Sequence, residues 1–337
     1  MQLEPKMHNF PAYSRLATRR AQGTMTETTL QGLTERIGAD HVARRLAVET
    51  RHEAQLFGQG TLLFNVENWN PAPWIVETAL KATGLYGRAR RNADRVEVRR
   101  NLVTSTRLPA AFDGFTILQL SDLHADISAG AMAHLRDIVR YVACDICVLT
   151  GDYRGKTFGP FEVSLASMKD VCARIKLPLY GILGNHDSIR MTPALEAMGI
   201  RMLFNESETI VRNGEAIHLA GIDDAHFYRT DDIPKAAAAI PRDAFSILLA
   251  HTPESYREAA KAGFDLMLSG HTHGGQLCLP GGIAIKLEAR LPRRMGAGAW
   301  RFDKLAGYTS VGAGTSLAPV RLNCPAEITV HTLRRLW

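Results

Sequence analysis

Residues 115–124 read Phe-Thr-Ile-Leu-Gln-Leu-Ser-Asp-Leu-His, and this stretch decides the fold. The mostly apolar run from 115 to 120 predicts a short buried strand. Two polar residues, Asp122 and His124, follow directly where that strand ends. Because sites in α/β proteins form beyond the carboxyl ends of the strands, the stretch predicts both a fold class and the place of a site.

The chain after this strand repeats the alternation of strand and helix. Further strands are expected at 145–149, 179–183, 245–249 and 266–268, shorter β segments at 201–204, 208–212 and 216–220, and closing strands at 308–311 and 327–330. Helices are expected at 130–143, 161–174, 193–198 and 254–262. Alternating β and α elements predict an α/β fold in which helices cover the sheets.

Each of the four longer strands that follow also ends in polar residues suited to metal binding. In chain order these residues are Asp152; Asn185, His186 and Asp187; His251; and His271 and His273. One such group is common by chance, whereas five such groups, each at the end of a strand, are improbable by chance. We therefore predict that the fold gathers them into one metal cluster. An extended backbone would let the alternate residues of Asp122-x-His124 and His271-x-His273 point the same way.

The residue types favour transition-metal ions over calcium. Imidazole, carboxylate and amide donors form a mixed nitrogen–oxygen site, which suits manganese, iron, zinc or nickel better than calcium. None of the five cysteines falls in these blocks, so a thiolate zinc site is not expected. Two ions about 3.5–4 Å apart can clamp a phosphoryl group and hold a hydroxide for in-line attack. The leaving oxygen then needs a proton or a positive neighbour, which His186 could supply.

These blocks resemble the motifs of the calcineurin-like metallophosphoesterase family. The matching segments are Asp122-Leu-His124, Gly151-Asp152, Gly184-Asn-His-Asp187, His251 and Gly270-His-Thr-His-Gly-Gly275. The tail from Gly312 to about residue 330 also looks like the bacterial membrane-linked branch of that family. The resemblance implies a β-sandwich flanked by helices.

The resemblance also implies a role for each matching residue. One ion would be held by Asp122, His124, Asp152 and His273, and the other by Asp152, Asn185, His251 and His271. Asp152 would bridge the two divalent ions, of which manganese is the first expectation. His186 would lie beside the phosphate, paired with Asp187, and these two are the predicted catalytic residues.

Basic residues near the blocks are candidates for substrate binding. Many relatives carry a second acid or an arginine a few residues after the Gly-Asp pair, whereas Tyr153-Arg154-Gly155-Lys156 follows here. Arg154 could reach a phosphate, or it could belong to a solvated loop. Residues 286–304 hold six basic residues, among them Arg293 and Arg294, against two acidic ones. That segment predicts either a basic lip over the metals or a mobile polar loop.

The excess positive charge lies in the N-terminal third. Residues 1–110 hold 16 Lys/Arg against 10 Asp/Glu, whereas residues 111–337 hold 24 of each. We place a domain boundary between them, with a basic, mostly helical N-terminal extension before a metallophosphoesterase domain at 111–337. Residues 1–25 are expected to form a loose leader, and apolar spacing over 26–57 predicts one or two helices with a break at Gly38.

Residues 61–107 of the extension are a candidate membrane-binding segment. A short apolar stretch at 61–66 precedes an expected helix, from about Asn70 to Gly84, that carries Trp74 and a broad apolar face. Seven arginines follow between residues 88 and 107. A Trp-bearing amphipathic helix next to arginines is typical of binding to an anionic membrane surface. The alternative is that the apolar face packs on this protein's own core.

The composition excludes several classes of protein. The 337 residues are 46% hydrophobic and 22% charged, which excludes disordered and fibrous chains. No apolar run approaches the roughly 18 residues of a membrane-spanning helix, and the first thirty residues lack the apolar centre of an export signal. Five cysteines in a chain of this length are no disulfide framework. We expect a cytoplasmic location, peripheral to the inner membrane face if the extension binds membrane.

The sequence therefore predicts a metal-dependent phosphohydrolase, and a phosphodiesterase or diphosphatase in preference to a phosphatase for small monoesters. The basic, Trp-bearing extension favours an anionic, lipid-linked substrate. A nuclease of the same superfamily is the alternative, although aromatic residues total only 7% and no module with stacking aromatics is evident, which disfavours nucleic acid. A non-catalytic scaffold is a third interpretation, but scaffolds usually lose metal ligands that this chain keeps.

Overall fold

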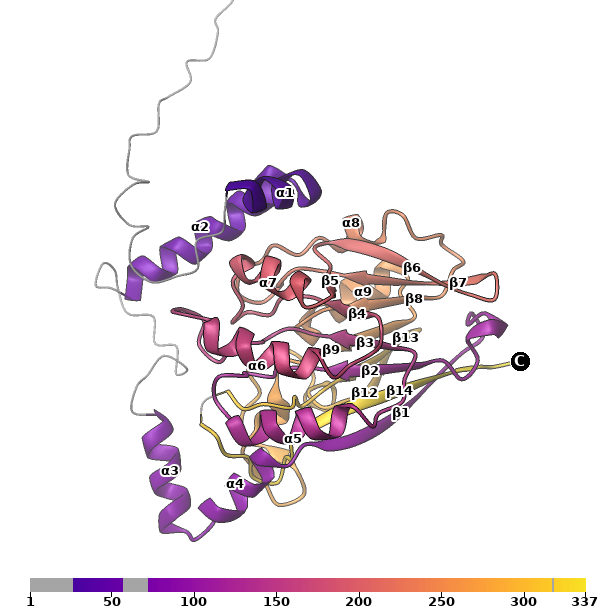
Figure 1. The fold of residues 1–337 in the computed structure, drawn as a ribbon. Helices are drawn as coiled ribbons and strands as arrows, with labels where there is room; N and C mark the ends of the chain where they lie inside the picture. The colour runs from indigo at the N-terminus through magenta and orange to yellow at the C-terminus, as the bar shows by residue number, and fades with distance from the viewer. Residues whose placement is uncertain (1–26, 57–71, 317) are drawn as a thin grey trace, which may run out of the picture.

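Two six-stranded sheets stack into a sandwich in the computed structural model, which describes residues 27–56, 72–316 and 318–337 (Figure 1). The first sheet has the order β1 (Glu97–Ser105), β14 (Glu327–Arg335), β2 (Thr116–Leu120), β3 (Ile146–Leu149), β4 (Leu179–Gly181) and β5 (Ile200–Met202). The second has the order β12 (Gly298–Phe302), β13 (Leu305–Thr309), β9 (Leu266–Ser269), β8 (Ser246–Leu249), β7 (Glu215–Gly221) and β6 (Glu206–Arg212).

The central strands of both sheets run parallel. In the first sheet β2, β3, β4 and β5 pair in parallel, and in the second β7, β8, β9 and β13 do so. Antiparallel partners lie toward the edges: β14 beside β2, β6 beside β7 and β12 beside β13. Because parallel strands end on the same side, their carboxyl-terminal loops meet at one edge of the sandwich.

Apolar side chains fill the space between the sheets and the layers outside them. Ile117 and Val148 of the first sheet share a buried cluster with Ile247 and Leu268 of the second. The helices α5 (Ala129–Val139), α6 (Glu162–Cys172) and α7 (Thr192–Ala197) cover the first sheet, and α8 (Ile233–Ala237) and α9 (Tyr256–Ala262) cover the second. This architecture confirms the expected α/β sandwich flanked by helices.

Four helices precede the first strand among the described residues. They are α1 (Glu27–Ile37), α2 (Ala39–Leu56), α3 (Ala72–Ala82) and α4 (Tyr86–Asp94). The predicted break lies at Gly38, whose φ of +96° is left-handed and suits glycine. The α1–α2 pair and the α3–α4 pair lie at opposite flanks of the sandwich (Figure 1). The expected leader at 1–25 and the apolar stretch at 61–66 lie outside the described residues.

The arginine-rich stretch after α3 forms a helix and a strand that the sequence did not predict. It forms α4 and then β1, which pairs in parallel with β14 from Glu97↔Glu327 to Ser105↔Arg335. The predicted boundary at 110/111 therefore leaves one strand of the first sheet in the N-terminal segment. Arg99 and Arg100 interrupt the alternation of β1, which is why the strand could not be seen in the sequence.

Helix α2 is anchored to the sandwich by a buried cation. The side chain of Arg45 is fully buried, with Nη1 3.2 Å from Asp223 Oδ1 and its guanidinium 3.3 Å from the ring centre of Tyr228. His41 Nε2 lies 2.9 Å from the other oxygen of Asp223. A buried charge is tolerated only when it is paired, so these contacts hold α2 in one position.

This cluster predicts a loss of stability in acid. Burial would raise the pKa of Asp223, but Arg45 and His41 outweigh it and lower that pKa from 3.8 to about 2. A lowered carboxyl pKa stabilises the fold above its unfolded value, and this contribution disappears as the pH falls from about 4 to 2. The free energy of unfolding should drop by roughly 2 kcal/mol over that range through this group. Asp223→Asn should be less stable at neutral pH and show a shallower acid slope in chemical unfolding; an unchanged slope would contradict the assignment.

None of the described helices is both long enough and apolar enough to cross a lipid bilayer.

Candidate metal centre

The predicted ligands lie at the carboxyl ends of five neighbouring strands and are all buried. Asp122 and His124 follow β2, Asp152 follows β3, Asn185 follows β4, His251 follows β8, and His271 and His273 follow β9. Two sheets thus contribute to one site, because each supplies parallel strands that end at the same edge.

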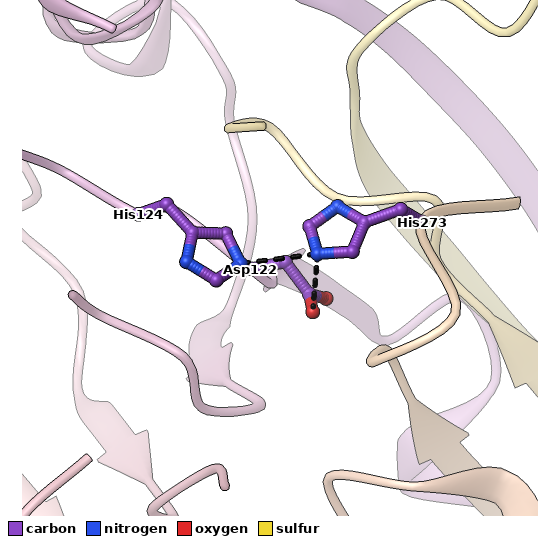
Figure 2. A group of neighbouring side chains, drawn as sticks. All are labelled: Asp122, His124 and His273. Atoms are coloured by element: carbon purple, nitrogen blue, oxygen red, sulfur yellow. Dashed lines mark hydrogen bonds and ion pairs between the residues drawn. The ribbon is translucent and has the colours of Figure 1, made fainter. Parts of the chain in front are cut away.

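Three of these residues form a first cluster, which consists of Asp122, His124 and His273. Figure 2 shows the two imidazole rings turned toward each other, with the carboxylate of Asp122 beside them. The Nε2 atoms of His124 and His273 are 3.0 Å apart, and His273 Nε2 is 3.6 Å from Asp122 Oδ1. One donor atom of each residue lies within 4.8 Å of the others, so a single ion can contact all three.

A second cluster consists of Asp152, His251 and His271, with Asn185 beside it. His251 Nε2 lies 2.9 Å from Asn185 Oδ1 and 3.3 Å from Asp152 Oδ2. The same Oδ2 atom of Asp152 lies 3.8 Å from Nε2 of His124, a member of the first cluster. Asp152 therefore lies between the two clusters, where a bridging ligand would have to be.

Backbone carbonyl groups fix which nitrogen of three histidines is free. Nδ1 of His124 donates to the carbonyl of Arg154 at 2.8 Å, and Nδ1 of His251 donates to that of Thr150 at 2.8 Å. His271 donates through Nε2 to the carbonyl of Glu288 at 2.9 Å. In the neutral ring, which is the form that binds a metal ion, the other nitrogen of each histidine then carries the lone pair. A carbonyl partner on the second nitrogen is the usual arrangement of a metal-binding histidine.

Burial and close charges shift the pKa values of the residues at this site. Burial alone would lower the pKa of His251, but Asp152 and Asp122 outweigh it and raise that pKa to about 10. Burial would raise the pKa of Asp152, yet His251 and His186 hold it well below its usual value. Burial and the neighbouring His251 lower the pKa of His271 to about 3, which keeps it neutral and able to ligate. A divalent cation pair therefore fits this donor set.

The ligand loops have an unusual backbone. Asp122, His124, Asp152, His271 and His273 all have positive φ, between 38° and 69°. These side chains leave the strands through left-handed turns, and not from the extended backbone that the alternate spacing suggested. Non-glycine residues in this region are sparsely populated and cluster at functional sites.

Glycines in the same motifs make room for the ligand carboxylates. A Cβ atom at Gly270 would overlap Oδ2 of Asp122, and one at Gly184 would overlap Oδ1 of Asp152. Both motif glycines are therefore required by close approach, which explains why Gly-His-Thr-His and Gly-Asn-His-Asp each begin with one.

Comparison with known proteins agrees with this geometry. Residues 115–275 match the family described as calcineurin-like phosphoesterase. Over 235 residues the chain is 32% identical to the phosphodiesterase YaeI of Escherichia coli, covering 65% of this chain and 82% of YaeI. The chain belongs to the calcineurin-like phosphoesterase family.

Other members of the family align over similar lengths. The metallophosphoesterase YkuE of Bacillus subtilis is 29% identical over 271 residues, covering 76% of this chain and 92% of YkuE. A transmembrane protein with a metallophosphoesterase domain from Bos taurus is 29% identical, covering 76% of this chain and 60% of that protein. The present chain is accordingly a metallophosphoesterase, a hydrolase with two buried His/Asp clusters.

His186 lies at the border of this phosphoesterase centre. Its Nδ1 is 3.1 Å from Thr157 Oγ1, and its Nε2 is 3.9 Å from Asp152 Oδ2. The ring meets that of His124 edge-on, with 5.1 Å between the ring centres. This imidazole is thus next to both clusters without being part of either.

Asp187 differs from the prediction. Its Oδ2 accepts the backbone N–H groups of Asp152 and Gly184 at 2.8 and 2.9 Å, and its Oδ1 accepts that of Tyr153 at 2.8 Å. Thr157 Oγ1 lies next to Nδ1 of His186, whereas the carboxylate that was expected to pair with His186 accepts these backbone groups. Asp187 therefore ties together the loops that carry Asp152 and Asn185. Burial and the charge of Asp152 raise the pKa of this carboxyl to about 6.

The predicted substrate-binding arginines contact the protein's own backbone. Arg154 is buried, and its three guanidinium nitrogens donate to the carbonyl groups of His186, Gly159 and Thr157. Arg293 is exposed and donates to the carbonyls of Ala284 and Ile285. Arg294 is also exposed. Their contact with substrate stays a prediction.

The substitution Arg154→Met tests whether Arg154 binds the substrate or positions the loop of His186. Because Arg154 ties the carbonyl of His186 to those of Thr157 and Gly159, we expect kcat to fall by about 10–100-fold, as for other residues that orient functional groups, with KM little changed. A rise in KM at constant kcat would instead show that Arg154 binds substrate. Arg293→Met provides the comparison on the exposed segment, where a basic lip predicts an effect on KM.

Three residues that support the centre carried no signal in the sequence. Glu49 of α2 accepts Ser188 Oγ at 2.7 Å and the N–H of Ile189 at 2.8 Å, and Arg45 Nη2 donates to the carbonyl of Asp187 at 2.8 Å. Arg321, fully buried, donates to the carbonyl of Gly314. Helix α2 therefore holds the loop after Asn185 and His186 from outside the sheets.

Proposed function

We propose that this phosphoesterase hydrolyses a phosphodiester or diphosphate bond in an anionic, lipid-linked substrate, with two divalent ions of which manganese is the first candidate. The observation that carries the proposal is the position of Asp152, whose Oδ2 faces His251 of one cluster and His124 of the other. Two adjacent ions are the arrangement that phosphoryl-transfer enzymes use for in-line displacement.

The protein side of the reaction follows from the donor set. Asp122, His124 and His273 would hold one ion, and Asn185, His251 and His271 the other, with Asp152 shared. When bound, the ions would neutralise the phosphoryl oxygens and lower the pKa of the attacking water. The carbonyl groups that hold the histidine rings keep their free nitrogens directed inward, so little reorganisation is needed on binding.

His186 would serve the leaving group. Its imidazole lies beside both clusters, and Thr157 Oγ1 orients it through Nδ1. Because Nδ1 faces Thr157, Nε2 would be the nitrogen that donates a hydrogen bond or a proton to the departing oxygen, as general acid catalysis requires. The phosphodiesterase YaeI, to which the chain is 32% identical, favours a diester as the substrate.

The lipid-linked part of the proposal is supported by charge and exposure. The N-terminal 110 residues carry the whole excess of positive charge, and Trp74 on α3 is 68% exposed. We propose that the protein works at the inner face of a membrane as a peripheral protein, where an anionic amphiphile is within reach.

The experiment begins with metal-free protein prepared by chelation. Bis(4-nitrophenyl) phosphate and 4-nitrophenyl phosphate are offered with manganese, iron, zinc or nickel, and bound metal is counted. We expect two ions per chain and a higher kcat/KM for the diester. No turnover in protein holding two ions would favour a scaffold, and preference for the monoester would refute the diesterase proposal. Metal-dependent cleavage of single-stranded DNA in place of the aryl diester would favour a nuclease.

A further inference from the structure

We infer that the groove between α3 and the hairpin β10 (Cys278–Leu279)–β11 (Ile283–Ala284) receives an acyl chain of an anionic lipid whose head group lies toward the metal centre. This inference rests on the proposed function, because it names the class of amphiphile that the same site would take. It extends the binding surface to a segment 200 residues away from α3 in the sequence.

The groove is apolar and large enough for a chain. Its volume is about 680 Å³, within the range of about 300–1,000 Å³ that is typical of ligand sites. Its walls come from α3, the hairpin and the tail, and include Val76, Ala79, Leu80, Leu277, Leu279 and Leu322. Polar side chains would bind the metal ions, so these apolar walls have no part in the metal centre. They suit an apolar ligand.

Large apolar side chains remain exposed around this groove. Leu279 and Ile283 are paired across the hairpin and are 52% and 58% exposed, and Ile285 is 64% exposed. On α3, Ile75 is 44% exposed and lies one helical turn before Ala79, which lines the groove. Exposed apolar side chains gathered beside an apolar groove are typical of a binding surface.

The groove continues the surface on which α3 packs. Val76 and Leu80 line the groove and also pack on a small cluster with Ala89 and Val320. The exposed Trp74 and Ile75 belong neither to that cluster nor to the lining of the groove.

Positive charge at the rim selects an anionic lipid over other apolar partners. Arg88 lines the groove, is exposed, and is joined to Asn323 Oδ1 at 2.8 Å. Arg91, one helical turn later, is exposed as well. Arginines beside an apolar face that bears a tryptophan are the combination found where proteins meet anionic lipid leaflets, because the cations contact phosphates while the apolar side chains enter the acyl layer.

The hairpin is attached at both ends to the metal centre. On one side, Cys278 Sγ donates to the carbonyl of Gly274, the residue after His273. On the other, the carbonyl of Glu288 accepts the Nε2 proton of His271 at 2.9 Å. A chain seated against the hairpin would therefore bring its phosphate to the side of the groove where the histidine loop lies. This continuity argues for a lipid substrate and against an unrelated protein partner.

The test uses the full chain and vesicles of phosphatidylcholine, with or without phosphatidylglycerol. We expect flotation with the anionic vesicles and quenching of tryptophan fluorescence when the acyl chains are brominated. The chain has four tryptophans, so a tryptophan placed in the groove wall by Leu279→Trp should add quenching to that of the wild type. Unchanged quenching in Leu279→Trp, or a wild type indifferent to anionic vesicles, would overturn the inference.

Charge placed on the hairpin gives a second readout. The double variant Leu279→Asp with Ile283→Asp should reduce vesicle binding by about tenfold or more, since it removes apolar contact and adds repulsion. Val211→Asp is the matched control, because Val211 is 66% exposed on β6, away from the groove. Equal binding by the double variant and this control would overturn the inference. Neither readout uses catalysis, so protein that hydrolyses the aryl diester but ignores vesicles would refute the groove alone, and the converse would refute the hydrolytic proposal.

Discussion

Asp152→Asn is expected to lower turnover of an aryl phosphodiester by on the order of a thousandfold or more, and to cost the protein at least one of its two ions. Oδ2 of Asp152 lies 3.3 Å from His251 Nε2 and 3.8 Å from His124 Nε2, between the two clusters. The amide has nearly the same shape but no charge, so it cannot offset two adjacent cations. Losing several kcal/mol of charge stabilisation corresponds to this factor in rate.

The measurement combines metal analysis with steady-state kinetics on the same protein. Asp170→Asn is the matched control, since it makes the same chemical change on the exposed side of α6. The backbone N–H of His186 donates to Oδ1 of Asp152 at 2.9 Å, and the carbonyl oxygen of asparagine can keep that bond. The fold should therefore survive, and a variant that keeps two ions and full activity would show that Asp152 does not bridge.

The ends of the strands could be predicted from the sequence because a short local pattern marks each of them. An apolar run followed by Asp or His can be read without knowing what lies next to it, as at Leu120 followed by Asp122 and His124. Parallel pairing then brings such ends together, so the polar residues of the site could be named before their distances were known. Their assignment as seven ligands of two ions came from the family resemblance. The helices over the sheets followed from the same alternation.

Residues whose partners lie far away in the sequence show no local pattern that could reveal their contacts. Glu49 and Ser188 are 139 positions apart, and Arg45 and Asp187 are 142 apart. On α2, these side chains looked like ordinary charges of a surface helix, and only the packing of α2 against the loops buries them. The contacts of Asp187 were missed for the same reason. Asp187 follows His186 in the sequence, but its carboxylate accepts hydrogen bonds from the backbone N–H groups of Asp152 and Gly184.

His186→Ala should leave both ions bound. For a phosphodiester with an alkyl leaving group, it should lower kcat by about a hundredfold to ten-thousandfold, the range of general acid catalysis. His186 lies beside the clusters and belongs to neither of the two donor groups, so metal content separates its role from that of a ligand. Thr157→Val removes the hydroxyl that orients Nδ1 at 3.1 Å and should cost less, about 10–100-fold.

The leaving group provides the sharper discrimination. If His186 donates a proton to the departing oxygen, the loss in His186→Ala should be large for an alkyl leaving group and small for 4-nitrophenolate, which leaves without help. Thr157→Val should show the same trend in weaker form, because it disturbs the orientation of His186 and not its chemistry. If the loss were the same for all leaving groups, His186 would bind the phosphoryl oxygens instead, and the proton would have to come from solvent.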